Sequence, residues 1–457
     1  MMVNAQHKVV SELCHAALSA VDPARAVAGR LRLDGERLAV GERSYNLSGG
    51  RLVVIGAGKA AGTMAAAVEG LLGERIAAGW VNVRRGYEPA APLRRIHVHS
   101  AGHPIPDAAG VEGTQQMLQR LAGLGAGDLV LLLLSGGASA LLELPVAGVE
   151  LTELQRLTAA LLRSGAPIGE VNTVRKHLSQ VKGGRLARWA GPAQVAVLVL
   201  SDVVGSPLEA IGSGPCAPDP TTYADTWDVL ERYGLAAELP AGVRAHLERG
   251  RRGEVAETAK PGDPSLGRVA HTIVADNATA AHAAVRRAAE LGYHALLLTT
   301  YLEGEAREVG RVFAALGKEV ARHRRPVAPP AILVLGGETT VTVRGPGTGG
   351  RNQEAALAAA LALEGWPEVL VATLATDGSD GPTDAAGAIV TGETAGRARA
   401  QGLDPAACLA RNDAYPFFAA LGDLIQTGPT GTNVNDLAFV VVGQTIAPAP
   451  GRWRKES

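Results

Sequence analysis

Short apolar runs that stop at glycine, each followed by a helix-like segment, recur through this 457-residue chain. In the first half the apolar runs lie at 51–58, 78–83, 95–99, 128–134 and 194–200, and the helix-like stretches at 59–72, 109–123, 151–163 and 168–190. A strand that is apolar throughout must be covered on both faces, and a helix between two strands returns the chain so that they run parallel. The alternation therefore predicts a parallel sheet covered by helices.

The second half repeats this order, with apolar runs at 271–275, 294–300, 331–337 and 370–375. Between the halves, residues 251–267 are charged, contain proline and lack apolar periodicity, which is typical of a linker. We predict an α/β protein with a Rossmann-like domain at 1–250, a linker at 251–267 and a second α/β domain at 268–457. Both sheets are expected to be mostly parallel, with a small-molecule site in the interdomain cleft.

The net charge is −1, so the chain has no electrostatic footprint for nucleic acid or for an anionic membrane. No stretch reaches about eighteen consecutive apolar residues, and the N-terminus does not resemble a signal peptide. The three cysteines are far apart and lack metal-binding spacing. We predict a cytoplasmic protein that binds neither nucleic acid nor membrane. A homodimer remains open.

The segment IGAGKAAG, residues 55–62, joins an apolar run to a helix, a geometry that favours a phosphate or a carboxylate. Gly56, Gly58 and Ala61 also fit a loose dinucleotide fingerprint. The next apolar run ends in Arg84 and Arg85 without an acidic residue for a ribose, so only an NADP interpretation survives. Lys59 favours an anion site, and a tight turn with a solvated lysine is the alternative. His103 is interpreted as structural.

Two further glycine segments in the first half could approach a ligand. The first, LLSGGASALL, offers Ser135, Gly136, Gly137 and Ser139 as a second anion cradle. The second, NTVRKHLSQVKGGRLA, carries Arg175 and Lys182 around Gly183–Gly184, and two glycines inside a good helix suggest close approach of a ligand. A solvated charged stripe is the alternative there.

Acidic and basic residues follow apolar runs at four more places. Asp202 suits a metal or a hydroxyl, or simply caps a turn, and Glu338 follows a Gly-Gly pair. Arg351 begins a helix, where its charge opposes the macrodipole, so an external anion is expected. Asp377 and Asp380 are close enough to share a cation or to divide into base and metal ligand. A cluster of Asx turns is the alternative for that pair.

Eight blocks in order make the chain resemble the class II glycerate 2-kinase family, whose C-terminal part is called the MOFRL domain. The blocks are VVIGAGKAAG, AGHPIPDAAG, LLSGGASALL, NTVRKHLSQVKGGRLA, LSDVVGSPLEAIGSGP, GGETTVTVRGPGTGGRNQE, ATDGSDGPTDAAGA and TGPTGTNVNDL. The resemblance implies two α/β domains and phosphorylation of D-glycerate at its 2-hydroxyl by ATP and Mg²⁺. It also implies importance for Lys59, Arg351 and Asp377.

Residues and resemblance together predict the following site. Lys59, Arg351 and Asp377 are catalytic, and Lys59, Arg175 and Asn352 bind substrate. Ser135, Gly136, Gly137, Ser139, Lys182, Gly183 and Gly184 bind nucleotide, and Asp202, Glu338 and Asp380 hold the metal. Whether Lys59 contacts the glycerate carboxylate or the phosphoryl group is left open. The alternatives are an NAD(P)-dependent hydroxypyruvate reductase and a non-catalytic sensor of a sugar acid or nucleotide.

Overall fold

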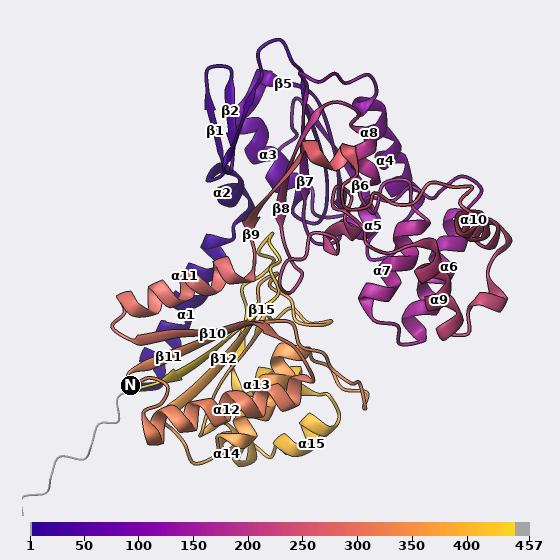
Figure 1. Cartoon of the computed structure of the whole chain (residues 1–457). Helices are drawn as coiled ribbons and strands as arrows, with labels where there is room; N and C mark the ends of the chain where they lie inside the picture. Colours follow the sequence, from indigo (N-terminus) through magenta and orange to yellow (C-terminus); the bar gives the residue numbers. More distant parts are fainter. Residues whose placement is uncertain (1, 444–457) are drawn as a thin grey trace, which may run out of the picture. The chain divides into compact units, whose positions relative to one another are not determined.

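The computed structural model describes residues 2–443, which form two compact units (Figure 1). One contains residues 22–276 together with residues 431–433. The other contains residues 277–430 and 434–443, together with the N-terminal helix α1 (Met2–Ala20). We call them the 22–276 unit and the 277–443 unit.

The chain passes from one unit to the other after Asp276, beyond the linker expected at 251–267. Strand β9 (Val269–Ala275) explains the difference, because it pairs in parallel with β8 (Gln194–Leu200) and extends the sheet of the 22–276 unit. Helix α1 packs on α11 (Asn277–Glu290) and therefore belongs to the 277–443 unit. Met1 and residues 444–457, the ends of the expected domains, lie outside the described residues.

The 22–276 unit is built on a parallel six-stranded sheet, as predicted. Its order is β6-β5-β4-β7-β8-β9. The first four strands of that order are β6 (Ile96–Ala101), β5 (Ile76–Arg84), β4 (Leu52–Ala57) and β7 (Leu129–Leu134). Every residue of β4 and β7 is buried, because helices such as α3 (Ala61–Leu72) and α4 (Ala108–Leu121) pack on the sheet.

A small antiparallel sheet that the sequence analysis did not anticipate precedes β4. Its strands are β1 (Leu31–Asp34), β2 (Arg37–Val40) and β3 (Arg43–Asn46), and helix α2 (Pro23–Ala28) comes before them. Gly35 and Gly41 take the tight turns with φ of +56° and +58°, a region that glycine enters without strain. Three- and four-residue apolar patterns of this kind are too short to distinguish from loop.

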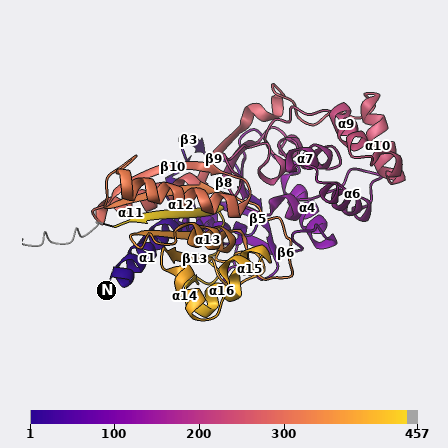
Figure 2. The same ribbon diagram turned by 90° about the horizontal axis from the view of Figure 1, so that it is seen from below.

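Four helices of the 22–276 unit form a core of their own, seen together in Figure 2. They are α6 (Leu151–Arg163), α7 (Ile168–His177), α9 (Tyr223–Arg232) and α10 (Ala241–Arg251). The single helix expected at 168–190 is instead divided into α7 and α8 (Arg185–Trp189). Gly183 and Gly184 directly precede α8 and have φ of +55° and +75°, which interrupts the helical path.

The sheet of the 277–443 unit is mixed, which corrects the expectation of mostly parallel strands. Its order is β10-β11-β15-β12-β13-β14. The strands are β10 (His294–Leu302), β11 (Ala331–Gly337), β12 (Val369–Ala375), β13 (Gly387–Thr391), β14 (Leu424–Ile425) and β15 (Asp436–Val442). Strands β10 and β11 are parallel, but β15 lies antiparallel between β11 and β12. Strand order along the chain cannot reveal such an insertion.

Helices cover both faces of this second sheet, with α1 and α11 on one and α12 (Ala306–His323) and α13 (Arg351–Ala362) on the other (Figure 1). Helix α13 contacts α14 (Thr394–Ala400), α15 (Pro405–Ala410) and α16 (Ala414–Leu421). Small residues allow α12 and α13 to approach closely: a Cβ atom on Gly310 would lie 2.1 Å from the carbonyl oxygen of Ala355.

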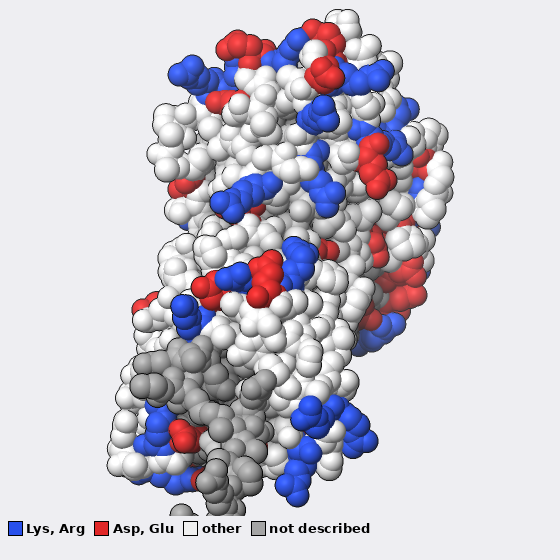
Figure 3. Space-filling model, turned by 90° about the vertical axis from the view of Figure 1, so that its left-hand side faces the viewer, with Lys and Arg blue, Asp and Glu red and all other residues white. Residues whose placement is uncertain are grey.

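Positive and negative side chains are interspersed on the face shown in Figure 3.

Between residues 2 and 443, none of the helices combines the length and the apolar character needed to cross a bilayer.

Candidate active site

Charged, polar and glycine residues that could bind a ligand follow the carboxyl ends of the parallel strands in the 22–276 unit. Lys59 follows β4, His103 follows β6, the segment Ser135–Gly137 follows β7 and Asp202 follows β8. Because the strands are parallel, these ends share one edge of the sheet. Open α/β sheets bind ligands at this edge.

The backbone of the loop after β4 is already hydrogen-bonded within the protein. The amides of Gly58, Lys59 and Ala60 donate to protein oxygens at 3.1, 2.8 and 3.0 Å, the last to Ser135 Oγ. Gly58 is needed because a Cβ atom there would lie 2.1 Å from that Oγ. These amides cannot also cradle a phosphate, so an anion at this loop must be bound by side chains.

The loop after β7 is different, because its glycine amides remain available. Among residues 2–443, no hydrogen bond engages the amides of Gly136 and Gly137. The carboxylate of Asp202 lies against this loop, since a Cβ atom on Gly136 would be 2.1 Å from Asp202 Oδ2. Asn433 Nδ2, from the segment 431–433, approaches the same oxygen at 3.5 Å.

His103 and Lys59 meet at Gly137, which has a φ of +86°. A Cβ atom on Gly137 would lie 3.0 Å from His103 Nε2 and 3.6 Å from Lys59 Cγ. Burial, helped by the charges of Lys59 and Arg84, lowers the pKa of His103 to about 4, so its ring is neutral at physiological pH. The sequence pattern around His103 favours a structural role, and only the tertiary structure shows that this residue neighbours Lys59.

Arg175 and Ser139 are brought into contact with each other. Arg175 Nη2 donates to the carbonyl oxygen of Ser139 at 2.8 Å, and burial lowers the pKa of this arginine. The hydroxyl of Ser139 lies 3.0 Å from the hydroxyl of Ser213. Both predicted site residues therefore lie close to the loop after β7.

Lys182 occupies a buried position in an ion pair, which counts against its assignment to the nucleotide. Its side chain is fully buried, and Nζ donates to Glu143 Oε2 at 2.8 Å and to the carbonyl oxygen of Leu142 at 2.6 Å. Burial lowers the pKa of Lys182 to about 8, although Glu143 opposes the shift. An ammonium enclosed in this way cannot reach a nucleotide.

Gly183 and Gly184 also serve the packing of the chain rather than a ligand. Their amides donate to the carbonyl oxygens of Ser213 and Gly214 at 3.1 and 2.7 Å. A Cβ atom on Gly184 would lie 2.5 Å from the Cβ atom of Ala259. The Gly-Gly interruption that suggested a ligand is thus accounted for by close packing of neighbouring residues, and we do not retain it in the nucleotide site.

In the 277–443 unit, Arg351 begins α13 and binds two internal carboxylates. Its Nε and Nη2 donate to the carboxylate of Asp436 at 2.5 and 3.1 Å, and Nη1 lies 3.0 Å from Glu338 Oε1. Burial alone would lower the pKa of Arg351, but the two carboxylates raise it above its ordinary value. The sequence pattern suggested that Arg351 stands at the start of a helix in order to bind an external anion. The two internal carboxylates provide another reason for an arginine at this position.

Asp380 supplies the negative charge that a helix N-terminus favours. Its buried carboxylate accepts hydrogen bonds from the amides of Asn352 and Gln353 at 3.1 and 2.8 Å, and from Asn352 Nδ2 at 3.3 Å. Burial raises its pKa to about 6, against the effect of those amides. Asp380 is therefore a capping group for α13, and its geometry does not favour the metal-ligand assignment.

Asp377 lies half-buried in the loop after β12 and forms an Asx turn, its Oδ1 accepting from the amide of Ser379 at 3.1 Å. Burial raises the pKa of Asp436, and the nearby charge of Asp377 raises it further. Asp436 was missed by the sequence analysis. The available signal was an acidic residue at the start of an otherwise apolar strand.

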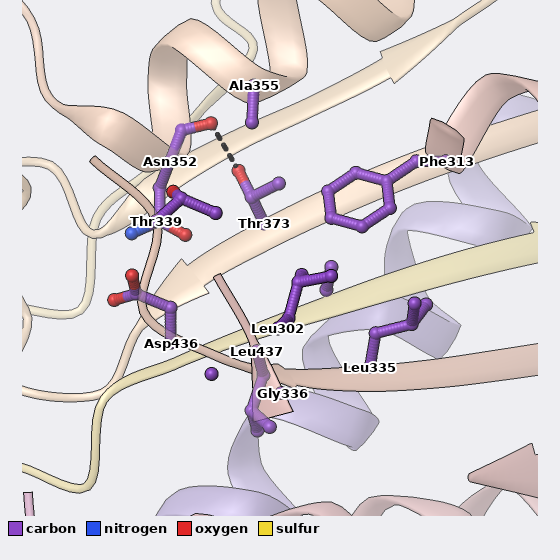
Figure 4. A pocket seen from close by; sticks show the side chains of 12 residues that line it. Leu302, Phe313, Leu335, Gly336, Thr339, Asn352, Ala355, Thr373, Asp436 and Leu437 are labelled. Atoms are coloured by element: carbon purple, nitrogen blue, oxygen red, sulfur yellow. Dashed lines mark hydrogen bonds between the residues drawn. The ribbon is translucent and has the colours of Figure 1, made fainter. Parts of the chain in front are cut away.

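Two hollows adjoin Arg351 and Asn352. The larger, of about 560 Å³, is lined by Glu338, Gly349, Gly350 and Arg351, among others. The smaller, shown in Figure 4, is a pocket of about 20 Å³ beside Asn352, enough for one water molecule. The larger hollow is of a size that small-molecule ligands occupy.

No three or more His, Cys, Asp or Glu side chains in the described part of the chain are grouped to hold a metal by themselves. Mg²⁺ in phosphoryl-transfer sites needs only one or two carboxylates, because substrate phosphates complete its shell. Half-exposed Glu338 and Asp377 and the carboxylate of Asp202 are compatible with that use.

Comparison with known proteins places this geometry in a family. Residues 9–248 match a domain of unknown function (DUF4147), and residues 331–436 match the MOFRL family. A glycerate 2-kinase of Pyrococcus horikoshii is 44% identical over 93% of this chain and 95% of its own length. An Agrobacterium vitis protein with the provisional name hydroxypyruvate reductase is 42% identical, covering 95% of this chain and 94% of its own.

The fold is also that of a solved structure. The crystal structure of a glycerate kinase from Thermotoga maritima matches with a TM-score of 0.86 and 43% identity, over 96% of this chain and all of that one. A match of this extent includes both units. The chain therefore belongs to the glycerate kinase family whose C-terminal part is the MOFRL domain.

Proposed function

We propose that this protein is a glycerate 2-kinase, which transfers the γ-phosphoryl group of ATP to the 2-hydroxyl of D-glycerate and forms 2-phosphoglycerate. The observation that carries this proposal is the 44% identity to a glycerate 2-kinase along 93% of the chain. The matched region includes both units, and each unit presents charged groups suited to phosphoryl transfer.

Phosphoryl transfer needs positive charge on the phosphoryl oxygens, aligned reactants and a group that accepts the proton of the attacking hydroxyl. We assign charge stabilisation to Arg351, whose guanidinium Asp436 and Glu338 hold in one orientation. Asp377 is assigned the role of base, since its carboxylate is half-exposed at the end of β12. Lys59 contributes a second positive charge at its own strand end, and Asn352 and Arg175 remain predicted substrate contacts.

Mg²⁺ would supply the positive charge that is needed for the negatively charged phosphates of ATP to approach Arg351. The carboxylates of Glu338, Asp377 and Asp436 outnumber this one arginine, so the side chains alone would repel a triphosphate. A divalent cation bound to the phosphates would reduce that repulsion. Glu338 is the proposed ligand in this unit, and Asp202 remains a predicted ligand in the other.

We assign the nucleotide phosphates to the loop after β7. The amides of Gly136 and Gly137 are free of protein partners among the described residues, so they can donate to phosphate oxygens. Ser135 and Ser139 flank them. Lys182, Gly183 and Gly184 are left out of this proposal for the packing reasons given above.

Hydroxypyruvate reduction is the second candidate, because a 42% identical relative bears that name. A dinucleotide fold would place the pyrophosphate on the glycine loop after β4. In this structure the amides of Gly58, Lys59 and Ala60 already donate to protein oxygens, which counts against that site. The kinase is therefore the better-supported function.

One set of assays distinguishes the two activities. Purified protein is incubated with D-glycerate, ATP and Mg²⁺, and ³¹P NMR separates 2-phosphoglycerate from 3-phosphoglycerate. NADH and NADPH oxidation with hydroxypyruvate is followed in parallel. We expect 2-phosphoglycerate that depends on ATP, less or no product from L-glycerate, and no oxidation of either nicotinamide. Formation of 3-phosphoglycerate, or nicotinamide oxidation without phosphorylation, would overturn the assignment.

The cytoplasmic location and the homodimer stay predictions. Sedimentation of the purified chain would test the oligomeric state directly.

A further inference from the structure

We propose that Arg84 and His103, together with Lys59, form the subsite that binds the carboxylate of the acceptor. The inference rests on the proposed function and resolves which anion Lys59 contacts. All three residues follow or end neighbouring parallel strands of the 22–276 unit, at the edge where ligands bind.

Lys59 and Arg84 are cations without a carboxylate partner. Within residues 2–443, neither side chain forms an ion pair or a hydrogen bond with the protein. The guanidinium of Arg84 lies only over the ring of Tyr87, 5.1 Å from its centre. The adjacent Arg85, by contrast, donates to Asp107 at 2.6 Å. Two neighbouring cations left unpaired beside a ligand edge favour an external anion.

His103 can add a neutral hydrogen-bond donor to these charges. Its Nδ1 is buried and has no hydrogen-bond partner in the described chain, so a proton placed there would have no acceptor. An unsatisfied buried N–H is costly, which favours the tautomer with its proton on Nε2. Nε2 is the ring nitrogen that lies near Gly137, the glycine that the Lys59 side chain also approaches.

A pocket of about 510 Å³ opens beside Arg84 and His103, and the paired residues Arg85 and Asp107 also line it. Lys59 lies outside this wall, but it is close enough for its charge to lower the pKa of His103. This volume easily admits a three-carbon acid. A Cβ atom on Gly137 would contact both His103 and Cγ of Lys59, so the two side chains lie close to the same glycine.

The chemistry of the loop favours a carboxylate over a phosphate at this position. Phosphate cradles use backbone amides, and those of Gly58, Lys59 and Ala60 already donate within the protein. Recognition here must therefore come from side chains. A planar guanidinium matches a planar carboxylate through two parallel hydrogen bonds.

The test compares Arg84→Gln, Arg84→Lys and His103→Gln with wild type, measuring kcat and separate KM values for D-glycerate and ATP. Arg85→Gln is the matched control, because Arg85 is the next residue and is paired with Asp107. We expect Arg84→Gln to raise KM for glycerate about tenfold or more, with KM for ATP within about twofold. Arg84→Lys should recover part of the loss, and His103→Gln should raise the same KM by a smaller factor.

A rise in KM for ATP equal to that for glycerate would overturn the carboxylate assignment in favour of a phosphate contact. Unchanged KM values, or an equal effect of Arg85→Gln, would also overturn it. Calorimetric titration of D-glycerate into each protein without ATP keeps the inference separate from the reaction. If wild type binds glycerate and Arg84→Gln does not, the result supports the subsite even without turnover. Equal binding by the two proteins refutes it. Thermal unfolding verifies that each variant is folded.

Discussion

The guanidinium of Arg351 and the carboxylate of Asp436 are joined by two hydrogen bonds of 2.5 and 3.1 Å, although the residues are 85 positions apart. Asp436 is the first residue of β15, the strand inserted between β11 and β12. The insertion therefore does more than complete a sheet. It brings a buried carboxylate to the start of α13 and determines the orientation of the arginine proposed to stabilise the transferring phosphoryl group.

Arg351→Lys is expected to lower kcat about 10²-fold or more, because lysine keeps the charge but cannot form the forked contact. Arg351→Ala should lose about 10³-fold or more, but it also leaves the carboxylate of Asp436 buried without a cation. Steady-state kinetics with D-glycerate and ATP, together with thermal unfolding, separates the two effects. Near-wild-type turnover of the folded lysine variant would remove Arg351 from the mechanism.

Asp436→Asn is expected to reduce kcat about tenfold to a hundredfold, because a misplaced catalytic group is costly even when it is present. KM for ATP should change little, since Asp436 is buried behind Arg351. Glu338→Gln is the comparison, because Glu338 approaches the same guanidinium from a more exposed position. If kcat of Asp436→Asn equals that of wild type, the orientation of Arg351 does not depend on this contact.

Lys182→Met is expected to lower the free energy of unfolding by about 3–5 kcal/mol, because it leaves the buried carboxylate of Glu143 without its partner. The folded fraction should keep the wild-type KM for ATP. Urea denaturation gives the stability, and the double variant Lys182→Met/Glu143→Gln should recover part of it. A stable single variant with a strongly raised KM for ATP would restore Lys182 to the nucleotide site.

Asp380 predicts a pH dependence of stability with an unusual sign. Its pKa is raised from 3.8 to about 6, so between these values the folded state binds more protons than the unfolded state. The contribution of this group to stability therefore falls as pH rises through that window, by about 2–3 kcal/mol in total.

Asp380→Asn removes this titration while keeping one acceptor at the start of α13. Denaturation of wild type and variant at several pH values from 4 to 7 measures the effect. The wild type should lose stability relative to the variant as pH rises. A constant difference between the two proteins across that range would show that the folded-state pKa of Asp380 is ordinary.

The sequence predicted most of what depends on neighbouring residues. Apolar runs ended by glycine identified the parallel sheet of the 22–276 unit and located Lys59 and Ser135–Gly137 at its strand ends. The ordered blocks indicated the family that whole-length comparison then established. The sequence did not reveal the short strands β1–β3, because their apolar patterns are too brief to recognise. It also did not reveal the break between α7 and α8.

The positions of glycines and charged residues in the sequence did not show which groups these residues contact in the folded protein. Gly183–Gly184 and Lys182 had the composition of a ligand site, yet they pack against distant backbone and against Glu143. Gly58 and Gly137 looked alike in sequence, but only the loop containing Gly137 keeps its amides available.

By itself, therefore, the sequence determined the α/β class, the strand, turn and helix units and the residues that could carry charge, because turn chemistry and apolar periodicity are local. Only the tertiary structure decided which charges are used internally and which remain available. It paired Arg351 with Asp436 and enclosed Lys182 with Glu143, while leaving Lys59 and Arg84 without a carboxylate in the described chain. Those outcomes depend on strand order and burial, which bring together residues that no local pattern connects.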